Sequence, residues 1–235
     1  MLIVNADDFG LSPGVNAGVA RTHEEGILTS ASLMVRRPAA PDAAAYAQRT
    51  PSLSVGLHVD LGEWEYRNGR WVALYQTVRP DGGDAAIERE VGAQLEDFRR
   101  LMGRDPSHID SHQHVHMHEP AIHVFRRIGL ELGILVRDLD VRFSGELYGQ
   151  DNYGKPIPDA VSVERMIEII AALEPGVTEL GCHPGLGADT GSVYDHEREL
   201  EVEVLCDPRV ADALESAGVA LRSFADIASG SPGSR

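Results

Sequence analysis

The sequence predicts an α/β fold in which successive βα units surround a parallel sheet or barrel. Short runs rich in β-branched residues alternate with amphipathic stretches along the chain, and this alternation is typical of βα units. A length of 235 residues with 43% hydrophobic residues suits one large α/β domain. We therefore expect a single domain over residues 1–228, followed by a disordered tail at 229–235 that is rich in Ser and Gly.

Seven apolar runs are the candidate strands of this sheet. Each is a short run of the kind that forms a buried strand, and turn-forming residues separate it from the next element. Their approximate ranges are 2–7, 28–35, 53–59, 107–112, 134–138, 177–183 and 219–223.

Helix signals lie between these runs. Ser12-Pro13 supplies an N-cap followed by Pro at the first helical position, and Gly26 ends the first helix. Asp207-Pro208 and Gly218 repeat the same pattern near the end of the chain. Three further stretches carry apolar residues at helical spacing, at 84–102, 119–132 and 162–174.

Two long segments, 60–83 and 139–161, interrupt the alternation of strands and helices. Both exceed the usual length of a connection inside a compact domain. We interpret them as loops over a site, where either could act as a lid.

The charge balance and the cysteine content exclude several classes of function. A formal net charge of −16 repels phosphate backbones and anionic membrane surfaces, so nucleic acid and lipid head groups are unfavourable partners. No apolar segment approaches the length of a membrane span, and acids stand where a signal peptide needs basic residues. We therefore expect a cytoplasmic protein without stable membrane insertion. The cysteines, Cys182 and Cys206, are too few for a disulfide scaffold and suit small core positions.

Polar residues with catalytic chemistry stand at the carboxyl ends of several predicted strands. In a parallel sheet or barrel those ends share one face, where residues far apart in the sequence converge. The candidate site therefore combines Asp7, Asp8, His58, Asp110, His112, Arg137 and His183.

The adjacent acids Asp7 and Asp8 end an apolar strand, and buried carboxylates must be paired, hydrogen-bonded or metal-bound. They could cap the following helix. With a tight turn at Gly10, one could instead bind a metal while the other acts as a base. A lone strand histidine such as His58 is more often a structural residue. Together with Asp8 and His112, however, it forms two histidines and one carboxylate, an arrangement typical of catalytic metal sites.

Five histidines lie within the eleven residues from His108 to His118. Neutral imidazole is the commonest metal ligand, so this density suggests a metal site. The strand should end near His112, however, and an open catalytic site needs only about three protein ligands. We therefore interpret His114, His116 and His118 as loop residues that line the cleft or orient the ligands, and we disfavour a patch that only stores metal.

Arg137 and His183 offer two further functions at strand ends. A guanidinium can hold a carboxylate ionised, which suits Arg137 as a partner for Asp7; a surface ion pair is the alternative. His183 is followed by Pro and Gly, which fix an abrupt turn. An imidazole that titrates near neutrality suits proton donation to a leaving amine.

Four motifs together resemble the YdjC-like (ChbG-type) carbohydrate deacetylase family. They are Asn5-Ala-Asp-Asp-Phe-Gly-Leu-Ser12, Gly56-Leu-His58, His108-Ile-Asp-Ser-His112 with His114-Val-His116, and Gly181-Cys-His-Pro-Gly185. Their order and spacing agree with the family from residue 1 to about 205. Many relatives carry a histidine where this chain has Gln113, so that histidine is dispensable. The resemblance implies a deformed (β/α) barrel of about seven parallel strands, related to NodB-type polysaccharide deacetylases.

The resemblance also implies a single divalent metal ion. Asp8, His58 and His112 match the metal ligands of the family. Their chemistry suits zinc or a similar transition ion, whereas the family is often described with magnesium. Both Mg²⁺ and Zn²⁺ therefore stay open.

The remaining roles follow from the same resemblance. Asp7 matches the general base, His183 the general acid, and Arg137 the arginine beside the base. The implied reaction is hydrolysis of an N-acetyl group on an amino sugar, such as a chitooligosaccharide, with release of acetate. The implied partner is a small N-acetylated sugar, and a homodimer is compatible with the sequence.

Aromatic residues are concentrated in one of the two long segments, between Trp64 and Tyr75. Ring faces suit the apolar faces of sugars, while Trp and Tyr keep a polar group for hydrogen bonding. Trp64, Tyr66 and Trp71 are therefore candidate substrate-binding residues, together with His114 and His116. The alternative is a loop that packs its own small core.

Three alternative functions stay open. The substrate could be a glycolipid such as a hopanoid-linked amino sugar, because the family has a branch associated with hopanoid biosynthesis. The chain could be a noncatalytic sugar- or metal-binding barrel, although Asp7, Arg137 and His183 argue against this. The same metal chemistry could also act on a phosphoester or a lactone, and the acidic chain disfavours phosphorylated substrates.

Overall fold

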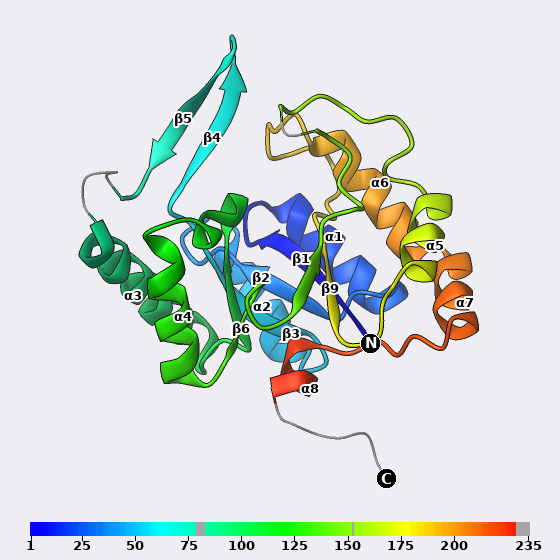
Figure 1. Ribbon diagram of the computed structural model, residues 1–235, viewed down its shortest axis with the longest axis horizontal. Helices are drawn as coiled ribbons and strands as arrows, with labels where there is room; N and C mark the ends of the chain where they lie inside the picture. The colour runs from blue at the N-terminus through cyan, green and yellow to red at the C-terminus, as the bar shows by residue number, and fades with distance from the viewer. Residues whose placement is uncertain (79–82, 152, 229–235) are drawn as a thin grey trace.

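A sheet of seven parallel strands forms the centre of the fold, in the order β7-β6-β3-β2-β1-β9-β8 (Figure 1). The computed structural model describes residues 1–78, 83–151 and 153–228, so the tail expected at 229–235 lies outside the described residues. The strands of this sheet are β1 (Leu2–Phe9), β2 (Ser30–Leu33), β3 (Ser54–Val59), β6 (His108–Ser111), β7 (Leu135–Val136), β8 (Arg142–Ser144) and β9 (Thr178–Cys182).

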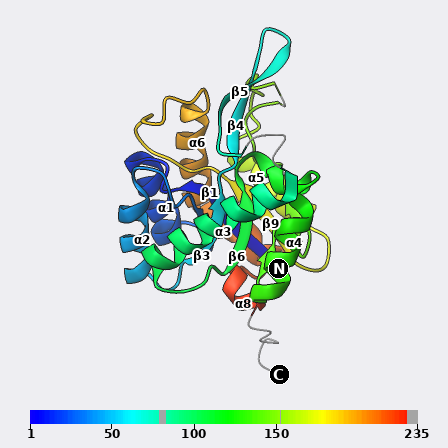
Figure 2. The same ribbon diagram turned by 90° about the vertical axis from the view of Figure 1, so that its left-hand side faces the viewer.

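The central strands are buried along their whole length, which is the usual state of a parallel sheet covered by helices. Helices pack around this sheet (Figures 1 and 2). They are α1 (Pro13–Glu25), α2 (Ala40–Arg49), α3 (Gly83–Met102), the 3₁₀ helix η2 (His112–Met117), α4 (Ala121–Leu132), α5 (Val163–Ala171), α6 (Asp195–Cys206), α7 (Pro208–Ser216) and α8 (Phe224–Ala228).

The helix signals in the sequence are found where they were expected. Ser12 caps α1 by accepting a hydrogen bond from the main-chain N–H of Val15, and Asp207 caps α7 in the same way through Arg209. The helices α2 and α6 were not anticipated. No helix among the described residues is long and apolar enough to cross a membrane.

The two edge strands of the sheet, β7 and β8, follow each other directly in the chain. A single bridge between Arg137 and Val141 links them, so the sheet curls back on itself. This arrangement confirms the deformed (β/α) barrel of seven parallel strands.

Within the central sheet, one predicted strand was wrong and another strand was missed. Residues 219–223 form only an isolated bridge, in which Leu221 pairs with Leu2. The pairing of β1 with β2 begins only at Asn5, so β2 does not pair with Leu2 on this side of β1. Residues 219–223 pair with Leu2 there, at one residue only. The seventh strand is instead β8, inside the segment 139–161 that was interpreted as a loop.

The other long segment folds into an antiparallel hairpin of β4 (Gly62–Arg67) and β5 (Arg70–Gln76), which projects away from the sheet (Figure 1). Its turn is Asn68-Gly69, with φ of 52° and 81°. Positive φ at both turn residues is the conformation that Asn-Gly favours in tight hairpins. Most of the segment 60–83, expected to be a loop, is therefore a hairpin whose turn is favoured by the sequence Asn68-Gly69. Residues 79–82 lie outside the described residues.

Candidate metal centre and active site

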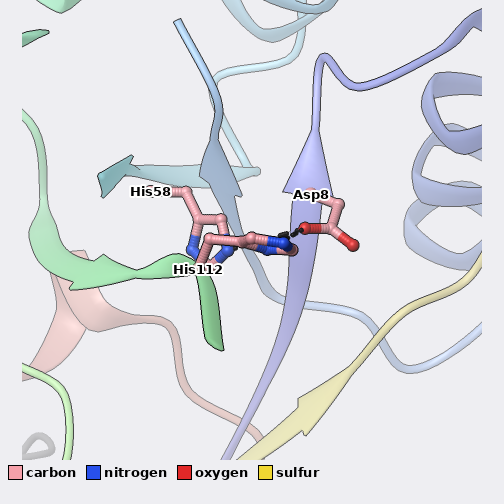
Figure 3. Close-up of side chains that lie close together, drawn as sticks. All are labelled: Asp8, His58 and His112. Atoms are coloured by element: carbon pink, nitrogen blue, oxygen red, sulfur yellow. Dashed lines mark hydrogen bonds and ion pairs between the residues drawn. The ribbon is translucent and has the colours of Figure 1, made fainter. Parts of the chain in front are cut away.

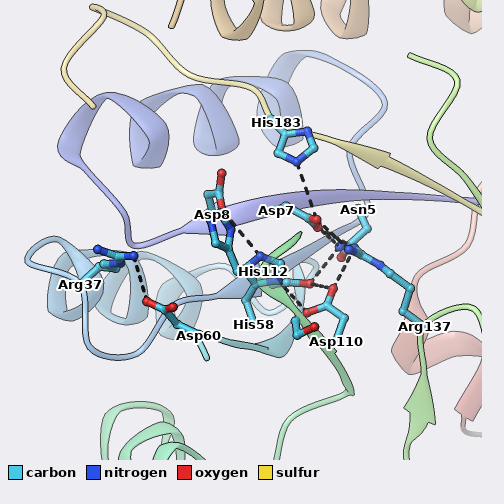
Figure 4. A network of polar contacts seen from close by, with 12 residues as sticks. Asn5, Asp7, Asp8, Arg37, His58, Asp60, Asp110, His112, Arg137 and His183 are labelled. Atoms are coloured by element: carbon cyan, nitrogen blue, oxygen red, sulfur yellow. Dashed lines mark hydrogen bonds and ion pairs between the residues drawn. The ribbon is translucent and has the colours of Figure 1, made fainter. Parts of the chain in front are cut away.

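The polar residues predicted at strand ends converge at the carboxyl edge of the sheet (Figure 4). They come from the ends of β1, β3, β6, β7 and β9, which are neighbours or near neighbours in the sheet. The structure brings together Asp7, Asp8, His58, Asp110, His112, Arg137 and His183.

Both acids at the end of β1 reach this site because the strand is irregular there. Successive residues of a regular strand point to opposite faces of the sheet. Asp8, however, has a φ of 62°, and the pairing with β2 shifts register between Ala6 and Phe9. A left-handed residue of this kind costs about 1–2 kcal/mol relative to ordinary strand geometry. Both carboxylates are buried, with exposed fractions of 4% for Asp7 and 1% for Asp8.

Asp8, His58 and His112 form the candidate metal centre (Figure 3). Asp8 Oδ1 lies 3.1 Å from His112 Nδ1 and 3.6 Å from His58 Nε2. One possible ligand atom from each residue lies within 4.8 Å of the others. His112 Nε2 is buried and has no hydrogen-bond partner among the described residues. Two imidazoles and one carboxylate fit a divalent transition ion with positions left open for water or substrate.

Asp110 orients His58 from behind. Its Oδ1 lies 2.8 Å from His58 Nδ1, and its Oδ2 accepts a hydrogen bond from Ser32 Oγ at 2.7 Å. A carboxylate on the far nitrogen is the usual support for a metal-binding histidine, because it fixes the ring and leaves Nε2 for the ion. Burial alone lowers the pKa of His58, but the carboxylates of Asp110 and Asp7 outweigh this effect and raise the pKa to about 10.

Asp7 is held by Arg137, as the sequence predicted. Arg137 Nη1 and Nη2 donate to the two carboxylate oxygens at 2.6 and 2.5 Å. Burial raises the pKa of Asp7, but the guanidinium of Arg137 and the charge of His58 together outweigh it, so the pKa lies below its ordinary value. Asp7 is therefore ionised at neutral pH and able to accept a proton.

Arg137 is completely buried and contacts two further carboxylates besides that of Asp7. Its Nε donates to Glu179 Oε1 at 2.8 Å, and its Nη2 lies 2.8 Å from Asp110 Oδ2. One guanidinium therefore faces three buried carboxylates. Burial raises the pKa of Glu179 to about 7, against the lowering effect of Arg137.

His183 stands next to Asp7 at the end of β9. Its Nε2 lies 3.8 Å from Asp7 Oδ2, and the rings of Tyr148 and Tyr194 flank it at centroid distances of 5.3 and 5.7 Å. Burial lowers the pKa of His183 to about 4, more than the nearby acids raise it. The ring is therefore neutral at pH 7 before any substrate enters.

The histidine-rich stretch divides into distinct roles after β6 ends at Ser111. Of its histidines, only His112 joins the candidate metal centre. His116 is completely buried, with Nδ1 2.7 Å from Ser111 Oγ and Nε2 3.3 Å from the main-chain oxygen of Arg137. The structure does not bring His116 to a surface that a substrate could touch. His114 is half-buried beside Phe143, and its contact with substrate stays a prediction.

The aromatic residues expected to bind substrate all lie on the β4–β5 hairpin. The main chain of Trp64 exchanges two hydrogen bonds with the side-chain amide of Gln113, both 2.9 Å long, which ties the hairpin to the histidine-rich stretch. Tyr66 packs edge-on against Trp71, and its ring lies 4.7 Å from that of Tyr153 in the other long segment. Trp71 is 56% exposed. The hairpin and the segment 139–161 therefore touch, while their role toward substrate stays a prediction.

The site contains residues that the sequence did not predict, among them Glu179 on β9 and the pair Arg198 and Glu201 on α6. Arg198 donates to Asp8 Oδ2 at 2.6 Å, and Glu201 accepts a hydrogen bond from the main-chain N–H of His183. The one available signal was a charged stretch free of Gly and Pro at 195–206, which favours a helix.

The family model for YdjC-like proteins matches residues 1–216 of the chain. The chain belongs to this family. A carbohydrate deacetylase of Geobacillus stearothermophilus is 35% identical over 96% of this chain and 97% of the relative. A chitooligosaccharide deacetylase of Serratia marcescens is 32% identical over 97% of this chain and 99% of the relative.

Solved structures agree with the fold of this YdjC-like protein. A protein of Enterococcus faecalis V583, described as a candidate cellobiose-phosphate cleavage protein, superposes with a TM-score of 0.76 at 23% identity, covering 96% of this chain and 98% of that one. A family 4 carbohydrate esterase of Streptomyces lividans, solved with acetate, gives a TM-score of 0.57 at 15% identity, covering 94% and 90%. At these identities the likeness shows a shared fold, which is that of NodB-type family 4 esterases.

Proposed function

We propose that this protein is a metal-dependent hydrolase that removes N-acetyl groups from amino sugars and releases acetate. The observation that carries the proposal is the juxtaposition at the end of β1. Asp8 faces His58 and His112, while the adjacent Asp7 is kept ionised by Arg137. The deacetylases among its relatives support a carbohydrate substrate, and chitooligosaccharide-like chains are the first class to test.

We propose that one divalent ion is held by Asp8, His58 and His112. Their nitrogen and oxygen donors favour Zn²⁺ or a similar ion, and Mg²⁺ is the alternative. When bound, such an ion supplies Lewis acidity, which acidifies water and polarises a carbonyl oxygen.

Asp7 and His183 would divide the proton transfers between them. Asp7 is ionised and can take a proton from the attacking water. Its Oδ2 lies 3.8 Å from His183 Nε2, so that proton can pass to the imidazole and from there to the departing nitrogen. Arg137 does not need to touch substrate in this scheme, because it fixes both carboxylate oxygens of Asp7.

The sugar would lie between the metal centre and the hairpin. We propose Trp64, Tyr66 and Trp71 as residues that contact sugar rings, with His114 beside them. The exposed ring of Trp71 is free to stack on an apolar sugar face.

The proposal is tested by measuring acetate release from N-acetylated mono- and oligosaccharides with Zn²⁺, Mg²⁺ or Co²⁺. The wild type should release acetate, whereas Asp7→Asn should lose at least about 10²-fold in kcat and keep its metal content. The contacts among Asp8, His58 and His112 do not involve Asp7, which is why the metal should stay. Metal bound without turnover on any substrate would favour a noncatalytic barrel or a lipid-linked substrate, and loss of metal in Asp7→Asn would contradict the assigned roles.

A further inference from the structure

Helix α6 presses two buried charged side chains against the active site. Arg198 and Glu201 lie three positions apart on this helix, with exposed fractions of 6% and 0%. Charged side chains are rarely buried without a specific partner, so the contacts of each indicate its role.

Arg198 contacts the candidate metal ligand Asp8. Its Nη2 donates to Asp8 Oδ2 at 2.6 Å, whereas Asp8 Oδ1 faces His58 and His112. The guanidinium therefore takes one carboxylate oxygen and leaves the other for the ion. A charge-assisted hydrogen bond inside the protein holds the carboxylate in this orientation more firmly than a neutral one would.

Glu201 contacts the residue proposed as proton donor. Its Oε2 accepts the main-chain N–H of His183, and its Oε1 accepts the hydroxyl of Tyr194 at 2.6 Å. Arg198 Nη1 donates to the main-chain oxygen of His183 at 3.2 Å. The imidazole itself receives little guidance, because its buried Nδ1 has no hydrogen-bond partner among the described residues. The position of His183 therefore depends on its main chain and on the flanking tyrosine rings.

We propose that α6 supplies two positioning residues with separate effects: Arg198 presents Asp8 to the metal, and Glu201 places His183 for protonation of the leaving group. The inference rests on the proposed function. It requires that substitutions of Arg198 and of Glu201 cause different functional defects, although the two side chains lie on one helix.

The first arm of the test measures metal affinity directly. Apo-protein is titrated with Zn²⁺ in competition with a chromophoric chelator. Arg198→Gln should weaken zinc binding about 10- to 100-fold, the range seen when groups that support a metal ligand are removed. Saturating zinc should restore part of the activity, and Arg198→Lys should fall between wild type and Gln. Arg209→Gln, which removes an exposed arginine on α7, should bind zinc like the wild type.

The second arm measures dependence on the leaving group. Glu201→Met should bind zinc within about twofold of wild type but lose kcat on an N-acetylated sugar by up to the 10²–10⁴-fold that a general acid contributes. It should lose little on 4-nitrophenyl acetate, because nitrophenolate departs without a proton. Glu201→Gln keeps an acceptor for His183 and should restore the amidase activity, while Glu203→Gln on the exposed side of α6 should have no effect.

The pattern of defects in the two variants decides the inference. Separate defects, in zinc affinity for Arg198→Gln and in amide cleavage for Glu201→Met, support it. Parallel losses of zinc affinity and of both activities in the two variants would overturn it, because α6 would then have only a structural role. If Glu201→Met does not fold, Tyr194→Phe, which removes the hydroxyl donor to Oε1, must show the same selective loss in weaker form. A wild type that binds no zinc and releases no acetate would instead overturn the proposed function, and the inference with it.

Discussion

Replacing Arg137 with Met tests whether one buried guanidinium holds the active-site carboxylates together. Arg137 is completely buried and contacts Asp7, Asp110 and Glu179. Removing one partner of a buried ion pair costs about 3–5 kcal/mol, because the remaining charge is left without compensation. Here three carboxylates lose the same cation, so we expect a loss near the upper end, about 5 kcal/mol. Urea unfolding of the apo-protein, followed by far-UV circular dichroism, measures this difference.

A second substitution separates lost charge compensation from lost packing. Glu179→Gln leaves an oxygen to accept from Arg137 Nε, and burial already raises the pKa of Glu179 to about 7, so this variant alone should lose less than about 1 kcal/mol. In the double variant Arg137→Met with Glu179→Gln, one of the uncompensated carboxylates is gone. We expect it to recover about 1–2 kcal/mol relative to Arg137→Met. A double variant whose loss equals the sum of the two single losses would refute the shared-charge argument, as would a loss below about 1 kcal/mol for Arg137→Met.

Three further predictions concern individual side chains. Burial lowers the pKa of His116 from 6.5 to about 4, so the unfolded chain takes up its proton at higher pH than the folded protein does. The free energy of unfolding of the wild type, relative to that of His116→Gln, should therefore fall by about 3 kcal/mol as pH drops from 6.5 to 4. Urea unfolding of both proteins across this pH range measures the change. A difference in stability that does not change with pH would contradict the burial of a neutral His116 ring. His112→Ala should weaken zinc binding by more than about 100-fold, whereas His118→Ala, at an exposed position, should weaken it by less than about threefold. Chelator competition measures both affinities. Equal losses of affinity would point to a metal patch made of several histidines. Trp71→Ala should raise KM for an oligosaccharide about three- to tenfold with little change in kcat, as expected for one lost ring contact, and an unchanged KM would remove Trp71 from the substrate site.

The convergence of the site could be predicted from sequence because it depends on topology alone. Once the strands are parallel, their carboxyl ends meet, and this places Asp8, His58 and His112 together without any knowledge of side-chain conformation. The contact between Arg137 and Asp7 followed from the same reasoning and from charge.

Other features depend on tertiary contacts that leave no local pattern. The left-handed backbone of Asp8 has only a weak local signal, because Asp adopts positive φ more often than most non-glycine residues but still does so at few positions. Arg198 and Glu201 belong to a helix whose buried side includes charged residues. A helix of this kind lacks the apolar stripe by which helices are recognised in a sequence. The seventh strand is β8 rather than residues 219–223, because β8 pairs with β9 at the edge of the sheet whereas β1 is already paired with β2 from Asn5 onward. This pairing depends on the whole sheet and cannot be recognised from the residues of one segment.

The irregular end of β1 has a consequence for how this protein could change its specificity. The proposed base and one proposed metal ligand are neighbours in the chain, and successive Cα atoms across a trans peptide bond are always about 3.8 Å apart. Their spacing is therefore fixed by covalent geometry rather than by the closure of a loop or by the meeting of two domains. We expect the hairpin at 62–76, which is not part of the seven-stranded sheet, to accept insertions, deletions or new side chains while this spacing stays constant. If the hairpin contacts the sugar as proposed, substrate recognition can diverge there without changing the spacing between the proposed base and the proposed metal ligand.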